Sequence, residues 1–148
     1  MRIYLPLTAP DRAALELAST RLELAEGRPA WAVTAAAQRG FPGEDLEDLE
    51  YEALQDAVHV AYGTGSANQR ALVVAADVPD AALGEAADGG AFGTVLVSSA
   101  SARIASFHVT ELDAAAAEAD DTDPALLWFD ATEAADALAY LDGATTEG

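Results

Sequence analysis

Three carboxylates stand where short apolar runs end, which is where layered α/β proteins often place their ligand sites. Asp77, Glu111 and Asp130 each close or directly follow a strand-like segment. If the three strands were parallel neighbours, their carboxyl ends would meet at one edge of the sheet. Hard oxygen ligands of this kind suit Mg²⁺ or Ca²⁺, which would support phosphoryl chemistry. The alternative is that these acids cap the helices that follow and hold no metal.

His108 is the second candidate for chemistry because it lies in the strand-like segment 104–110 among few polar neighbours. It could act as a general base or a ligand together with Asp77, or it could be a hydrogen-bonded structural histidine. Ser106 is close to it in sequence, but a serine nucleophile needs spatial contact with its base. The chain has no cysteine and two histidines, so a zinc site is not expected. We predict no bound cofactor.

A run of acids, Glu44 to Asp56, holds seven carboxylates and no basic side chain. Its apolar residues recur at spacings of three and four, which predicts a helix over 44–62. Such a face could imitate the phosphates of a nucleic acid and bind a basic protein. It could equally be a solvated surface without a partner.

The charge of the chain narrows the classes of partner. Seven arginines and no lysine stand against 26 acids, which gives a formal net charge of −19 over 148 residues. Nucleic acids and anionic membrane surfaces are disfavoured as partners, since both are bound through cationic side chains. A basic protein would be attracted. Solubility or adaptation to salt would explain the same charge without any partner.

Strand-like and helix-like segments alternate along much of the chain, which predicts an α/β (or α+β) fold. We expect one layered domain with a mixed sheet of about five or six strands and helices packed on it. Segment 70–78 is apolar on both faces, as is typical of a central strand. The expected strands are 2–7, 30–34, 70–78, 94–98, 104–110 and 126–129, and the expected helices are 10–24, 44–62, 110–120 and 131–141.

The predicted domain covers residues 1–142, and residues 143–148 are expected to form a flexible tail. No apolar stretch approaches the roughly 20 residues of a membrane-spanning helix, and the amino terminus shows no secretory signal. We therefore expect a cytoplasmic protein.

Several short motifs in a fixed order resemble a family of small uncharacterised actinobacterial proteins. They are MRIYLP at the start, WAVT from Trp31, DLEYEAL from Asp48, residues 70–79, FHV from Phe107 and LLWF from Leu126. The resemblance spans nearly the whole chain and implies a cytosolic bacterial protein without an assigned activity. Members of that family do not consistently carry an acid at the position of Asp130, so the resemblance favours Asp77 and His108 as sites.

Taken together, the sequence favours a non-catalytic binding or regulatory protein. A metal-assisted enzyme using Asp77, Glu111 and His108 is the first alternative. An acidic decoy that binds a basic protein through Glu44 to Asp56 is the second.

Overall fold

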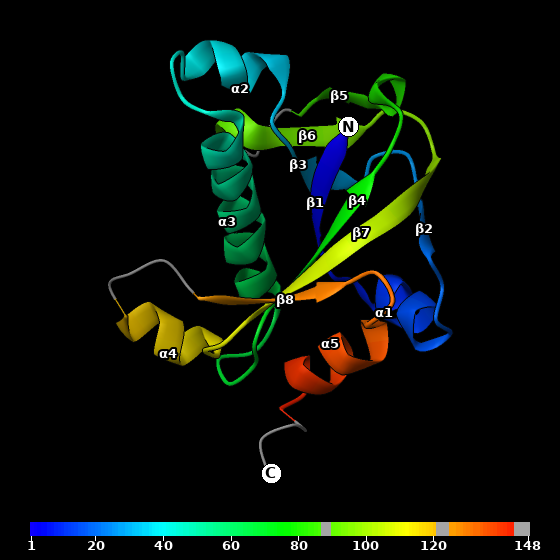
Figure 1. Ribbon diagram of the computed structural model, residues 1–148, viewed down its shortest axis with the longest axis vertical. Coiled ribbons are helices and arrows are strands. Elements are labelled where there is room, and N and C mark those ends of the chain that lie inside the picture. Colours follow the sequence, from blue (N-terminus) through cyan, green and yellow to red (C-terminus); the bar gives the residue numbers. More distant parts are fainter. Residues whose placement is uncertain (87–89, 121–124, 144–148) are drawn as a thin grey trace.

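The computed structural model describes residues 1–86, 90–120 and 125–143 (Figure 1). The helices are α1 (Ala9–Glu16), α2 (Ala35–Gly40), α3 (Leu46–Thr64), α4 (Ala114–Ala119) and α5 (Ala134–Leu141), with short 3₁₀ turns η1 (Asp80–Ala82) and η2 (Gly90–Phe92). The strands are β1 (Arg2–Pro6), β2 (Arg21–Leu24), β3 (Pro29–Trp31), β4 (Leu72–Asp77), β5 (Leu83–Glu85), β6 (Gly93–Leu96), β7 (Ala100–Thr110) and β8 (Leu126–Asp130).

The strands form one sheet in the order β2-β7-β4-β1-β3-β6-β5, and β8 also pairs with β7. Helices and strands occur together as predicted, so the fold class is confirmed. The prediction of a mixed sheet of five or six strands is wrong: the described residues form eight strands, and every pairing between them is antiparallel. Strands that are neighbours in the sheet therefore run in opposite directions, and no two of the described strands that run the same way pair with each other.

Helices cover both faces of the sheet. α3 lies along one face, and α1 and α5 lie on the other (Figure 1). Ile3 and Leu5 of β1 point into the core beneath α1 and α5, while Tyr4 between them points toward α3. β4 is buried on both faces, as its sequence predicts, because it lies between β1 and β7 at the centre of the sheet.

Both cores combine small and bulky side chains. On the α3 side, Ala53 and Ala57 belong to the same buried cluster as Trp31. The opposite core contains the fully buried Phe107 together with alanines such as Ala137. Each face of the sheet is therefore filled by large and small residues in combination.

The helix expected over 10–24 ends at Glu16, and the rest of that segment forms β2. The backbone leaves the helix through Ala18, which has a φ of 58°. Leu22 and Leu24 are buried while Arg21 and Glu23 are exposed, so the true pattern has a period of two. The prediction is wrong because Leu15, Ala18 and Leu22 also satisfy a helical spacing.

Other boundaries shift less. α2 was not predicted; it begins where Thr34 Oγ1 accepts a hydrogen bond from Ala37 N at 3.1 Å. α3 is displaced by two residues from its expected span, and α5 begins at Ala134 instead of 131. Most of the predicted tail, 144–148, lies outside the described residues. None of the helices described combines the length and apolar character needed to cross a bilayer.

A buried ion pair holds α1 to the sheet. Asp11 is only 4% exposed, and its Oδ2 lies 2.7 Å from Nη2 of Arg28, which also donates to the Pro6 carbonyl at 3.1 Å. Asp11 also completes a capping box with Thr8 at the start of the helix. Charge pairing and helix capping thus converge on one carboxylate.

Arg28→Met is expected to destabilise the protein by about 3 kcal/mol, because the buried Asp11 charge loses its partner. Urea unfolding at neutral pH measures the effect. Arg21→Met is the control, since Arg21 is exposed on β2 and bonds Ser101 weakly at 3.3 and 3.5 Å. Equal losses in the two variants would contradict the assigned role of the Arg28–Asp11 pair.

Candidate functional site

Asp77 lies at the end of β4 and forms an ion pair with Arg2 at the start of β1. The two residues are direct partners in the antiparallel register, and Asp77 Oδ1 accepts from Arg2 Nε at 2.7 Å. The hydrogen bond from Arg2 holds the pKa of Asp77 below its ordinary value. The carboxylate is therefore charged and already engaged.

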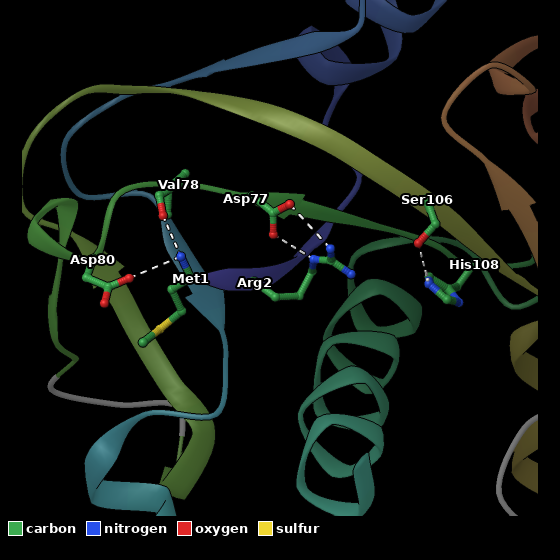
Figure 2. A network of polar contacts seen from close by, with 7 residues as sticks. All are labelled: Met1, Arg2, Asp77, Val78, Asp80, Ser106 and His108. Atoms are coloured by element: carbon green, nitrogen blue, oxygen red, sulfur yellow. Dashed lines mark hydrogen bonds and ion pairs between the residues drawn. The ribbon is translucent and has the colours of Figure 1, made fainter. Parts of the chain in front are cut away.

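The amino terminus extends the same network (Figure 2). The Met1 amino group donates to the Val78 carbonyl at 2.7 Å and lies 3.1 Å from a carboxylate oxygen of Asp80. These contacts fasten the start of β1 to the end of β4. The position of Asp77 in this network supports a structural role.

His108 lies near the end of β7, opposite Val73 of β4, on the α3 side of the sheet. Its Nε2 is 3.0 Å from Oγ of Ser106, a side chain that is only 6% exposed. Burial, together with the nearby Arg2 charge, lowers the pKa of His108 to about 4. The imidazole is thus neutral at physiological pH.

Asp77 and His108 share one face of the sheet, but they do not pair with each other. Arg2 points toward Asp77 in Figure 2, and the Ser106–His108 pair lies on the other side of the guanidinium in that view. The serine and histidine contact required by a nucleophile and its base is present. The orienting carboxylate of a triad is supplied neither by Asp77, which bonds Arg2, nor by Asp130, which bonds Thr132.

Glu111 and Asp130 lie elsewhere. β4 and β7 are antiparallel, so Asp77 and Glu111 stand at opposite ends of the sheet. Asp130 Oδ1 accepts from Thr132 N at 2.8 Å and Thr132 Oγ1 at 2.6 Å, and these bonds lower its pKa. The condition of the metal hypothesis, parallel neighbouring strands, is not met. Across residues 1–86, 90–120 and 125–143, no group of three or more His, Cys, Asp or Glu side chains could hold a metal ion.

The acidic segment Glu44 to Asp56 forms the lead into α3 and its first half. Glu47 and Asp48 lie in the first turn, where the helix dipole favours carboxylates. Burial raises the pKa of Asp56 above its ordinary value. The segment therefore presents a negative surface at the amino end of the helix.

A hollow with a volume of about 440 Å³ opens beside this surface. We call it the α3 hollow; it is lined by Phe41, Glu44, Asp48, Leu49, Tyr51, Glu52 and Phe92. The rings of Phe41 and Phe92 stack with centroids 5.7 Å apart and planes inclined by 5°. Phe41 and Tyr51 remain 41% and 43% exposed.

The chemistry of the α3 hollow is that of a cation site. Aromatic faces attract ammonium and guanidinium groups through their quadrupoles, and carboxylates add direct charge attraction. Asp48, Glu52 and Glu44 supply that charge. The combination favours a basic side chain over an anion or a neutral ligand.

Gln55 lies one turn further along the same face of α3. It follows Tyr51 and Glu52 by four and three residues, so its side chain leans back toward them. It is only 5% exposed, and neither polar atom of its amide has a hydrogen-bond partner among the residues that the structure describes. Gln55 does not line the α3 hollow, and its buried donor and acceptor reduce stability while they stay unsatisfied.

The acidic half of the α3 hollow was visible in the sequence, and the aromatic half was not. Phe41 falls in a turn and Phe92 in a glycine-rich segment directly before β6, so the two rings are far apart in sequence. Only the packing of η2 against α2 and α3 brings them together. An exposed phenylalanine directly before an acidic helix was the one available signal.

Comparison with known proteins gives one match. The sequence model of a "Family of unknown function (DUF6912)" matches residues 1–144. No curated protein and no solved structure matches the chain.

The low pKa of His108 predicts its titration. From pH 8 to pH 5 its ring protons should keep the chemical shifts of a neutral imidazole, because at pH 5 about nine-tenths of the side chain is still unprotonated. NMR of the wild type, with His59→Gln to assign the two histidines, measures this. A midpoint near the ordinary value of 6.5 would contradict the burial of His108.

The same shift sets the sign of a stability effect. The unfolded chain binds a proton at His108 near pH 6.5 and the folded chain only near 4, so the wild type loses stability as the pH falls through this window. His108→Gln should lose less stability over the same range of pH.

Proposed function

The DUF6912 family, to which this chain belongs, has no known function, and we propose from the geometry of the α3 hollow that the chain is a non-catalytic binding protein for a basic protein partner. A lysine or arginine side chain of that partner enters the α3 hollow. The observation that carries the proposal is the joint lining of this hollow by exposed aromatic rings and carboxylates.

The dimensions of the hollow support a side chain as the occupant. Its volume of about 440 Å³ is at the lower end of the range of ligand pockets in proteins. The long aliphatic stem of a lysine or arginine can pack on Phe41 and Leu49 while its charged head meets Glu52.

Charge supports the approach of such a partner. With a formal net charge of −19, the chain attracts a basic protein over a distance of about a Debye length. Seven acids lie between residues 44 and 56, so the attraction is strongest around the hollow. Association should therefore weaken as ionic strength rises.

A lysine- and arginine-rich peptide is expected to bind, and Glu52→Gln should weaken it by about tenfold, as expected for a partly desolvated ion pair. Phe41→Leu should weaken it by a similar factor, because it removes a ring face and keeps the apolar contact. Fluorescence anisotropy of the labelled peptide at low ionic strength measures both.

Glu23→Gln on β2 is the matched control, since it removes the same charge from an exposed site outside the hollow. A glutamate-rich peptide controls for non-specific binding. Equal weakening by Glu23→Gln and Glu52→Gln would show that net charge alone attracts the peptide, and the proposal would fail.

A further inference from the structure

A second hollow lies at the other end of α3, between the α3–β4 loop, α1 and the end of α5. Its volume is about 350 Å³. We call it the arginine pocket because two of the seven arginines, Arg12 and Arg70, line it together with Asn68, Gln69 and Asp142. Two cations at one small site are unusual in a chain with 26 acids.

Arg70 makes its contacts with neutral groups. Its Nη1 donates to the Tyr140 carbonyl at 2.6 Å, its Nε donates to the Glu111 carbonyl at 3.2 Å, and its guanidinium lies 4.0 Å from the centre of the Tyr140 ring. No carboxylate among the described residues forms an ion pair with it. The side chain is thus fixed by three contacts while its charge is not neutralised, and it keeps further N–H donors.

Arg12 balances the one carboxylate in the pocket. Its Nη1 and Nη2 donate to the two oxygens of Asp142 at 3.0 and 2.6 Å, and its Nε donates to Glu16 at 3.3 Å. The bidentate pair neutralises Asp142. The charge of Arg70 therefore remains in excess within the pocket.

The amide side chains of the loop add donors. Gln69 Oε1 accepts a hydrogen bond from the Ser66 backbone N–H at 3.0 Å, which fixes the orientation of the amide. The Gln69 NH₂ group is then left as a donor. Asn68 Oδ1 lies 2.8 Å from Ser66 Oγ and is engaged in the same way. The free polar groups next to Arg70 are thus mostly donors.

We infer that the arginine pocket binds a small molecule through a carboxylate or phosphate group, held by the Arg70 guanidinium and the Gln69 amide. Each group presents two oxygens that can accept parallel hydrogen bonds from the guanidinium fork. The pocket lies at the opposite end of α3 from the α3 hollow and shares no lining residue with it, so this site is separate from the proposed contact with a basic protein.

Isothermal titration of the whole chain with inorganic phosphate and with acetate, at matched ionic strength, tests the inference. Saturable binding of either probe is expected, and the stronger probe identifies the preferred group. Arg70→Gln should weaken this binding by at least about tenfold, as expected for loss of a charged hydrogen-bonding partner.

Gln69→Glu keeps an acceptor for Ser66 N and replaces the amide donor by a negative charge, so it should abolish binding. This variant tests the inference even if Arg70→Gln is poorly folded. Arg39→Gln, an exposed arginine on α2, should change nothing. No saturable binding of either probe, or equal binding by the wild type and Gln69→Glu, would overturn the inference. Neither result would bear on peptide binding at the α3 hollow.

Discussion

Burial of β4 between β1 and β7, with helices on both faces, is the constraint on which the rest of the structure depends. Alternate residues of β4 enter two different cores, so neither face can accept a charge before the strand ends at Asp77. The same antiparallel register places Arg2 opposite that acid. The ion pair at the end of the strand is therefore a consequence of the central packing.

Acidic and basic side chains also occupy separate places in the structure. Buried Asp11 is paired with Arg28, while three of the seven acids around the start of α3, Glu44, Asp48 and Glu52, line a hollow with exposed aromatic rings. At the opposite end of α3, Arg70 holds a positive charge against neutral carbonyls. One helix thus separates a site suited to cations from a site suited to anions.

The sequence predicted elements where a single period dominated. The doubly apolar β4 and the long α3 have no competing pattern, and both form within two residues of their expected spans. The segment 10–24 satisfied two periods, and tertiary pairing of β2 with β7 chose between them. The convergence of Asp77, Glu111 and Asp130 required parallel strands, and strand direction is set by long-range pairing that no local pattern encodes. The place of Phe92 in the α3 hollow is likewise set by long-range packing, in this case that of η2 against α2 and α3.

The most direct test of the α3 hollow as a cation site is a titration of isotope-labelled protein with a lysine- and arginine-rich peptide, followed by NMR. We predict that backbone shifts concentrate at Phe41, Phe92 and residues 44–55. Shifts spread evenly over the acidic surface, with Glu23 changing as much as Glu52, would contradict a specific site in this protein.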